Sequence, residues 1–302
     1  NIHGHEVNIE RLFNYIAKRQ IPAVWTMHDC WAITGYCPYF TIVKCERWKT
    51  KCYSCPQRRT YSWFFDRSGS NQERKKKAAE NLNLTVVTPS AWLADIMRES
   101  FLGKFPVKVI NNGIEQAVFQ PRESDFKKTH KCDDKIILLG VANGWGNHKG
   151  LDIFLRLNET LSKEYQIVLV GTDDEVKRTL PKDIIAINRT NNQIELAQIY
   201  SVADIFINPT REDNYPTVNM EAISCGTPVI TFRTGGSPEM VDDTCGSVVD
   251  VDDFDGMVRE IERYGKKTDE ARHRCMTKSM QFHAEDRFRE YVELYREILG
   301  GK

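Results

Sequence analysis

Two carboxylates in the second half of the chain have the type and spacing of a site for a phosphate and a sugar. Asp213 and Glu221 lie eight positions apart, on either side of the start of an expected helix. That helix begins near Pro216 and ends at Gly226, because proline favours the first helical position and glycine the position after the last. The first turn of a helix presents N–H groups and a partial positive charge, which suit a phosphate.

A lysine from another loop completes this pattern. Lys149 lies in the glycine-rich sequence GWGNHKG at 144–150, directly after an apolar strand at 136–142. A lysine beside a helix N-terminus neutralises a departing diphosphate without a metal ion. Glu221, about one turn into its helix, accepts hydrogen bonds from vicinal ribose hydroxyls. Since a glycine-rich loop alone is a weak signal and a surface lysine is usually solvated, the prediction depends on the combination.

Four cysteines mark a different kind of candidate site. Cys37, Cys45, Cys52 and Cys55 lie in an aperiodic segment at 30–70 that is rich in aromatic and basic residues. The last two have the spacing of a zinc knuckle, and the first two would complete a tetrahedral site. With four protein ligands such a zinc ion would be structural. The alternative is four reduced, partly buried thiols.

Composition narrows the classes of protein. The chain is long enough for two domains of ordinary size, and no apolar run is long enough for a membrane span.

The net charge is zero, but residues 1–120 carry 17 Lys and Arg against 10 Asp and Glu, whereas 121–302 carry 25 against 32. A basic first part suits an anionic acceptor or membrane surface, or reflects surface composition alone. No basic motif indicates a nucleic-acid partner. Nine cysteines without a secretion signal favour a reducing, cytoplasmic setting.

Hydrophobic periodicity organises the elements around these residues. A polar, aperiodic stretch at 120–134 predicts the inter-domain linker. We therefore expect an N-terminal domain at 1–120 with the Cys-rich insert at 30–70, a C-terminal domain at 121–285, and a final helix at 286–302 that packs back toward the first domain. Strands alternate with helices in the C-terminal domain, which predicts a parallel, doubly wound sheet.

Two features of the first domain add to this outline. A strand through 21–27 delivers His28 to its C-terminal end, where ligands gather in open α/β sheets. The charged run at 74–77 is predicted to form the solvated face of a helix. In the second domain Asp253-Phe254-Asp255 begins a helix, where capping explains the carboxylates better than metal binding does.

The motifs carry a family resemblance. DNYPTVNMEAISCGTP at 213–228, with GGSPEMV at 235–241, resembles the acid-x7-acid signature of family 4 glycosyltransferases of GT-B fold. NNGI at 111–114 resembles the segment that enters their linker, so the resemblance covers nearly the whole chain. The chain is most similar to bacterial exopolysaccharide enzymes of the colanic-acid biosynthesis type. These share the WTMHDCW-like segment at 25–31, the four-cysteine insert, and DNYP in place of Glu-Gly-Phe-Gly.

The resemblance implies two Rossmann-like, doubly wound domains, with an acceptor-side N-terminal domain and a C-terminal domain that binds the nucleotide sugar. It implies retaining transfer of a hexose from a UDP or GDP sugar, without a catalytic metal, to a growing polysaccharide. The acceptor would be an oligosaccharide or a polyprenyl-diphosphate-linked saccharide, met peripherally at the cytoplasmic face of the inner membrane. Because the family's N-terminal glycine-rich loop is absent, we expect the N-terminal domain to be incomplete.

By position, the resemblance implies three catalytic residues. His28 would lie near the transferring sugar, Lys149 would stabilise the diphosphate, and Asp213 would hold hydroxyls of the donor sugar. Glu221 would bind the ribose. The other implied donor- and nucleotide-binding residues are Gly146, Asn188, Arg189, Arg211, Asn214, Tyr215, Pro216 and Thr217.

Departures from the family pattern qualify these roles. Asp213 replaces the more usual glutamate and is one methylene shorter. The arginine that family members place before the lysine is missing from 143–148, so Arg211 or Arg189 would have to substitute for it. Asn188 and Arg189 would flank the base, and backbone N–H groups around Pro216, which itself has none, would face the phosphates.

No second carboxylate is placed to act as an enzymic nucleophile. Retention is therefore expected by acceptor attack on the face that the diphosphate leaves, with the leaving phosphate taking the proton. Two other functions stay open at this point. One is a GT-B nucleotide-sugar epimerase, and the other is a non-catalytic nucleotide-binding assembly module.

Overall fold

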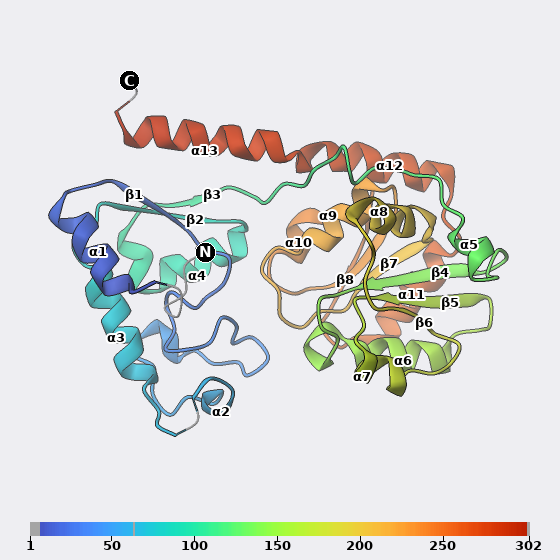
Figure 1. Ribbon diagram of the computed structural model, residues 1–302, viewed down its shortest axis with the longest axis horizontal. Coiled ribbons are helices and arrows are strands. Elements are labelled where there is room, and N and C mark those ends of the chain that lie inside the picture. Colours follow the sequence, from blue (N-terminus) through green and yellow to red (C-terminus); the bar gives the residue numbers. More distant parts are fainter. Residues whose placement is uncertain (1–6, 63, 301–302) are drawn as a thin grey trace. The chain divides into compact units, whose positions relative to one another are not determined.

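The chain folds into two compact units, which Figure 1 shows as a ribbon. The computed structural model describes residues 7–62 and 64–300. The first unit runs to Asn111 and takes up the chain again from Arg287, and the second comprises Asn112–Asp286. The division therefore precedes the predicted linker at 120–134. Residues 112–120 belong with the second unit because Ile114 forms a parallel bridge with His283 and Phe119 is buried in the second unit's core.

The first unit contains a three-stranded parallel sheet in the order β1-β2-β3. Its central strand LTVVT buries both faces, as parallel strands do. The strands are β1 (Ala23–Thr26), β2 (Leu84–Thr88) and β3 (Val107–Val109), and the helices are α1 (Ile9–Lys18), α2 (Arg58–Tyr61), α3 (Ser68–Ala79), α4 (Ala91–Glu99) and, from Arg287 on, α13 (Ala284–Ile298).

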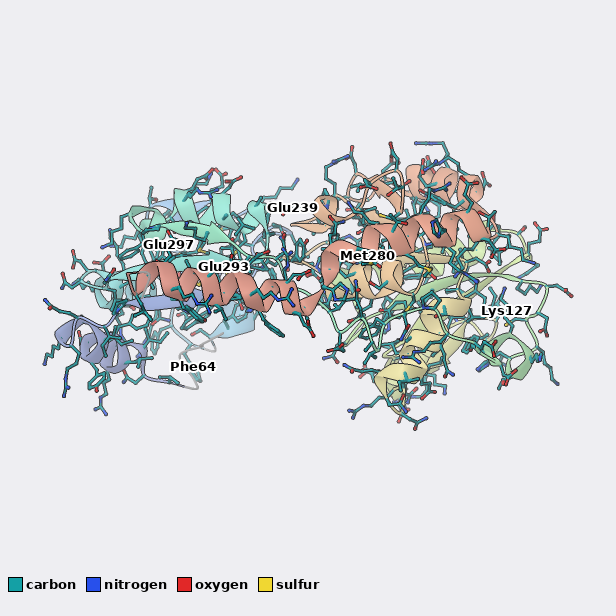
Figure 2. The ribbon with its side chains drawn as sticks, turned by 90° about the horizontal axis from the view of Figure 1, so that it is seen from above. Phe64, Lys127, Glu239, Met280, Glu293 and Glu297 are labelled. Atoms are coloured by element: carbon teal, nitrogen blue, oxygen red, sulfur yellow. The ribbon has the colours of Figure 1, made fainter. Side chains whose placement is uncertain are left out.

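Helix α13 packs on the sheet of the first unit. The Tyr291 hydroxyl lies 3.1 Å from Thr26 Oγ1, and Leu294 is buried in a cluster with Val87. Lys108 Nζ lies 3.5 Å from a carboxylate oxygen of Glu297, which is labelled on α13 in Figure 2. Apolar packing, with polar contacts at its margin, thus attaches the last helix to the first unit.

The insert between β1 and α3 has little regular structure, as its aperiodic sequence predicts. Apart from α2, the regular element between β1 and α3 in the described residues is one 3-10 turn, Arg47–Lys49. The charged run in α3 differs from the prediction of a solvated face. Lys75 is only 8% exposed, and its ammonium lies 3.9 Å from the centre of the Trp31 ring. Tertiary packing buries this one member of the run because the insert folds over it.

The second unit confirms the predicted parallel, doubly wound sheet. Six strands lie in the order β6-β5-β4-β7-β8-β9, and the central ones are buried on both faces. The strands are β4 (Ile136–Val141), β5 (Tyr165–Val170), β6 (Ile185–Ile187), β7 (Ile205–Asn208), β8 (Val229–Phe232) and β9 (Gly246–Val249). The helices are α5 (Phe126–Thr129), α6 (Leu151–Thr160), α7 (Asp174–Thr179), α8 (Gln193–Val202), α9 (Thr217–Ser224), α10 (Ser237–Met240), α11 (Phe254–Tyr264) and α12 (Asp269–Ser279).

Helices cover both faces of this sheet. Residues of α8, α9 and α12 share one buried cluster, and residues of α6 and α11 share another. Asp253 caps α11 by accepting from the Gly256 N–H at 2.9 Å, which agrees with the capping predicted for that motif. Helix α12 has a poor apolar pattern and was not predicted from the sequence, although Thr268 caps it.

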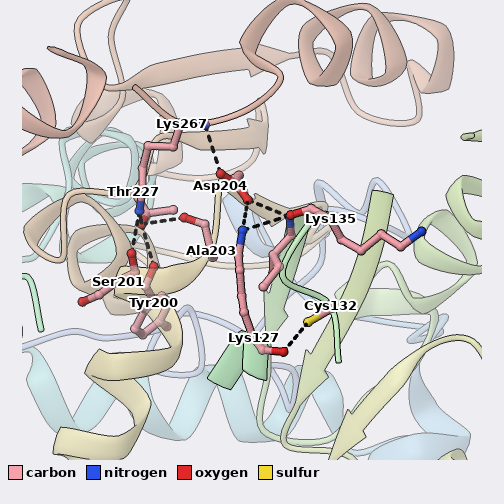
Figure 3. Close-up of polar contacts among 10 residues, drawn as sticks. Lys127, Cys132, Lys135, Tyr200, Ser201, Ala203, Asp204, Thr227 and Lys267 are labelled. Atoms are coloured by element: carbon pink, nitrogen blue, oxygen red, sulfur yellow. Dashed lines mark hydrogen bonds and ion pairs between the residues drawn. The ribbon is translucent and has the colours of Figure 1, made fainter. Parts of the chain in front are cut away.

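A buried ion-pair network locks the amino-terminal ends of β4 and β7 together (Figure 3). Asp204 accepts from the Ile137 N–H at 2.8 Å, from Lys127 Nζ at 3.2 Å and from the Lys267 N–H at 3.1 Å. The Lys267 ammonium donates to the Ser201 carbonyl and to a threonine hydroxyl, each at 2.8 Å. Burial lowers the pKa of Lys267 to about 8. The network therefore stabilises the amino-terminal edge of the sheet, which is opposite the edge formed by the carboxyl ends of the strands.

None of the helices in residues 7–62 and 64–300 combines the length and the apolar character that crossing a bilayer requires.

Candidate active site

The strand order of the second unit creates a switch point between β4 and β7. The chain winds outward from β4 in one direction through β5 and β6, then returns to β7 and continues in the other direction. Loops that follow strands on the two sides of such a point diverge and leave a crevice at the carboxyl edge, where ligands of open α/β sheets bind. The loops after β4 and β7 carry Lys149 and Asp213.

The structure brings these two residues into contact. Lys149 Nζ lies 2.9 Å from Asp213 Oδ2, and the side chains are 25% and 20% exposed. The other carboxylate oxygen of Asp213 accepts from the Asn214 N–H at 2.8 Å. A partly buried pair is screened less than a surface pair, so the ammonium and the carboxylate each hold the other in place at the crevice.

Glycines allow the two loops to approach. Gly150 has φ +73°, and a Cβ there would lie 2.5 Å from the Pro209 carbonyl oxygen. Next to it, the His148 carbonyl accepts from the Arg211 N–H at 2.9 Å. Gly146 begins the 3-10 turn at 147–149, and its carbonyl accepts from the Lys149 N–H at 3.0 Å. The glycine-rich sequence therefore serves close backbone packing that positions Lys149.

A second glycine pair supports Asp213 from behind. Gly235 has φ +53°, and a Cβ there would lie 2.1 Å from the Asp213 carbonyl oxygen. The Gly236 N–H donates to the Asn214 carbonyl at 2.6 Å. Substitution of Gly235 would thus displace the carboxylate loop.

Two hydroxyls next to this pair were missed in the sequence. Thr234 Oγ1 and Ser237 Oγ are buried and have no hydrogen-bond partner among the described residues. Buried hydroxyls normally find partners, so both are candidate donors to a ligand. In the sequence, the two adjacent glycines between these hydroxyl residues were the available signal, because such a pair indicates close approach of another backbone segment. That segment is the loop that carries Asp213.

The helix that we predicted to face a phosphate forms at the predicted position. Helix α9 starts after Pro216, includes Thr217 as its first residue and is followed by Gly226 at φ +78°. Asn214 and Tyr215 are 3% and 7% exposed, so their side chains belong to the interior.

Glu221 is held by two hydroxyls. Its Oε2 accepts from the Tyr200 hydroxyl at 3.0 Å, and Thr217 also hydrogen-bonds to the carboxylate. Burial raises the pKa of Glu221, and the two hydrogen bonds oppose that shift. Tyr200 is fully buried, and burial raises its pKa well above the usual range. The carboxylate is thus fixed in orientation before any ligand arrives.

Arg211 makes contacts that the sequence did not predict. Its guanidinium makes a bidentate pair with Asp152, with distances of 2.8 and 2.7 Å, and donates to Asp252 at 2.7 Å and to Asn147. The side chain is 12% exposed, and the hydrogen bond from Arg211 lowers the pKa of Asp152. These contacts make Arg211 a clamp for the loop that carries Lys149. Its role at the diphosphate stays a prediction.

We expect Arg211→Ala to lower donor affinity and turnover by about 10–100-fold, because the loop that carries Lys149 loses its clamp. Unfolding free energy should fall by only about 1–2 kcal/mol, since both aspartates are largely solvated. Isothermal titration with a nucleotide sugar and urea denaturation measure the two effects. Asp152→Asn is the control: a clamp role predicts that it weakens donor binding too, and unchanged or tighter binding would instead indicate direct phosphate contact by Arg211.

The remaining predicted residues follow other strands. Asn188 and Arg189 follow β6 and are exposed, and Asn188 Nδ2 donates to Asp174 at 2.8 Å. They belong to the same carboxyl edge as Lys149, two strands away in the sheet order. His28 follows β1 in the first unit and is exposed. Their roles stay predictions.

Comparison with known proteins shows what this part of the chain is similar to. Residues 134–266, which contain Lys149, Asp213 and Glu221, match the family model described as glycosyl transferases group 1. The match agrees with the resemblance recognised in the sequence.

Relatives extend the likeness beyond that domain. Over 259 residues, 80% of the chain, it is 26% identical to WcaC of Escherichia coli K12, which is named for colanic acid biosynthesis as a glycosyl transferase. The chain spans 60% of that relative's length.

Two solved structures share the fold, each with a TM-score of 0.70. Sucrose-phosphate synthase from Thermosynechococcus elongatus is 19% identical, and the alignment covers 96% of this chain and 71% of that one. HepE from Anabaena, in complex with UDP, is 15% identical, with 96% and 76% covered. These likenesses confirm the predicted GT-B fold.

Proposed function

We propose that this chain is a retaining glycosyltransferase that moves a hexose from a nucleotide-diphosphate sugar to a growing bacterial polysaccharide. The observation that carries the proposal is the Lys149–Asp213 contact of 2.9 Å at the β4/β7 switch point. A cation and a carboxylate meet there, and the helix that follows the carboxylate loop, α9, begins four residues after Asp213. This combination suits a diphosphate joined to a polyhydroxy ring.

Charge stabilisation would be the main catalytic device. As the bond between sugar and phosphate breaks, negative charge develops on the diphosphate, where Lys149 and the N–H groups at the start of α9 stabilise it. Asp213 would accept hydrogen bonds from the donor sugar and orient it. The acceptor would attack on the face that the diphosphate leaves, and the leaving phosphate would take the acceptor's proton. None of these proposed steps requires a divalent cation.

The nucleotide would be recognised through its ribose. Tyr200 and Thr217 fix the Glu221 carboxylate, so its lone pairs can accept from the two ribose hydroxyls without further ordering. UDP or GDP would be the carrier. Solved structures of the similar HepE contain UDP and UDP-glucose, which makes UDP-glucose the first donor to test.

The acceptor would be an oligosaccharide or a polyprenyl-diphosphate-linked saccharide at the cytoplasmic face of the membrane. Support comes from the name of the relative WcaC and from the excess of basic residues over 1–120, since anionic lipid carriers attract a basic surface.

Donor binding tests the proposal directly. UDP-, GDP- and ADP-sugars are titrated against the chain by thermal shift, and one of them should raise its melting temperature by several degrees. Glu221→Ala should abolish that rise while the variant still unfolds cooperatively. Glu262→Ala, an exposed glutamate of α11, is the matched control and should respond as the parent does.

Product analysis separates the competing functions. A transferase consumes the donor only when a saccharide acceptor is added, whereas an epimerase converts the nucleotide sugar alone. A ligand-induced shift without turnover in either assay would favour the assembly module and reject the transferase. The absence of any shift with all three donors would also reject the transferase.

A further inference from the structure

We propose that the four cysteines of the insert bind one structural zinc ion that folds this segment beside the strand end carrying His28. Cys37, Cys45, Cys52 and Cys55 line a single pocket, together with Phe40 and Trp48. All four are free thiols; two of them are buried and two are partly buried. The topology thus gathers the pairs at 37–45 and 52–55, which are separate in the sequence, around one small space.

The backbone at both pairs has the shape of a ligand turn. Lys44 has φ +47° and Ser54 has φ +42°, and each immediately precedes the second cysteine of its pair. Non-glycine residues rarely adopt this left-handed conformation, and where they do the surrounding structure holds them. A tight turn before the second cysteine lets both sulfur atoms of a pair face the same point, as two ligands of one metal must.

Hydrogen-bond donors face the sulfur atoms. The Gly35 N–H hydrogen-bonds to Cys52, and the Gln57 N–H hydrogen-bonds to Cys55. Amides that donate to metal-bound thiolates form the second shell of such sites and spread the sulfur charge. Burial raises the pKa of Cys52 and Cys55, and these donors oppose that shift.

Positive charge is available to balance the site. Zinc with four thiolates carries two negative charges, and Lys75 is buried within electrostatic range of Cys37 and Cys52. Arg47 lies within range of Cys55, and its guanidinium donates to the Tyr53 carbonyl at 2.8 Å. Asp29 is also within electrostatic range of Lys75, and the ammonium donates to the Trp31 carbonyl. An anionic metal centre would add a second counter-charge for this buried lysine.

The insert has little regular secondary structure, although some of its apolar side chains join the core of the first unit. Its irregular backbone is anchored where the Cys52 N–H donates to Gln72 Oε1 at 2.6 Å and the Cys55 N–H donates to Asp66 at 2.8 Å. Both anchors hold the knuckle that contains the last two cysteines. A metal clip contributes most to the folding of segments that lack regular structure, and this one begins directly after His28.

Binding has to complete a site that is only partly arranged. Across residues 7–62 and 64–300, no group of three or more His, Cys, Asp or Glu side chains already forms a metal-ligand set. Binding therefore requires the sulfur atoms to move, and rotation about χ1, which moves each sulfur between staggered positions, is one such movement. The four thiols would lose their protons to solvent as four zinc–sulfur bonds form, with no change of oxidation state.

Metal analysis of the intact chain tests the proposal. The chain, purified under reducing conditions without an affinity tag that binds metal, should contain about one zinc per molecule. Cobalt added to the metal-free chain should give the visible absorption of tetrahedral thiolate coordination. Removal of zinc by a chelator should lower the first unfolding transition by about 5 °C or more, and added zinc should restore it.

Variants connect the metal to these cysteines. Cys55→Ser and Cys45→Ser, which alter the two partly buried positions, should each lower zinc content at least tenfold. Cys132→Ser, a buried cysteine of the second unit, should retain it. Zinc below one-tenth equivalent in the parent with no cobalt spectrum would overturn the proposal, as would two disulfides found by mass spectrometry in the reduced preparation. Retention of zinc by both insert variants would also overturn it.

Discussion

Lys149→Ala lowers the rate of sugar transfer by about 10²–10³-fold while the protein stays folded. The expected loss is that of removing one charge that acts where charge develops in the transition state. Lys149 pairs with Asp213 at 2.9 Å, and a quarter of its side chain is exposed, so its removal costs the fold about 1 kcal/mol or less. Steady-state kinetics at saturating donor, with a melting curve of the same sample, measures both quantities.

Two further variants sharpen this prediction. Asp213→Asn keeps the shape of the side chain but removes its charge, and should lower turnover and weaken donor-sugar selection. Lys163→Ala is the matched control, because Lys163 pairs with Asp183 at the same 2.9 Å distance on an exposed surface. Equal activity of the Lys149 and Lys163 variants would exclude the diphosphate role of Lys149.

Asp204→Ala should destabilise the second unit by about 3–5 kcal/mol, the usual cost of removing one partner from a buried ion pair. The Asp204 side chain is 5% exposed. Without it, the N–H groups of Ile137 and Lys267 lose their acceptors and the ammonium of Lys127 loses its counter-charge. Urea denaturation gives the free energy, and hydrogen exchange of the β4 and β7 amides locates the loss.

A charge-neutral variant separates the two contributions. Asp204→Asn retains one acceptor oxygen and should cost less than the alanine substitution. Asp183→Ala removes an exposed aspartate from a surface ion pair and should change the unfolding free energy by less than about 1 kcal/mol. If Asp204→Ala were as mild as that control, the network of Figure 3 would not determine the register of β4 and β7.

Much of the architecture follows from local patterns. Apolar runs alternating with segments of helical periodicity predicted the parallel sheet of the second unit. The spacing of apolar residues in a strand or a helix reflects the local backbone geometry of that segment, so it can be read from the sequence of the segment alone. The same is true of α9, whose ends are set by Pro216 and Gly226. Helix α12 was not predicted, since its burial comes from one side of the folded sheet and its own apolar pattern is weak.

By itself, the sequence determined which residues we propose to carry the chemistry: Lys149, Asp213 and Glu221 in the second unit and four cysteines in the insert. Tertiary structure alone decided how they meet. The Lys149–Asp213 contact depends on β4 and β7 being neighbours, and the clamp role of Arg211 depends on a carboxylate 59 positions away in the chain. Contacts of this kind arise from strand order and loop packing, which bring together residues whose local sequences contain no sign of each other.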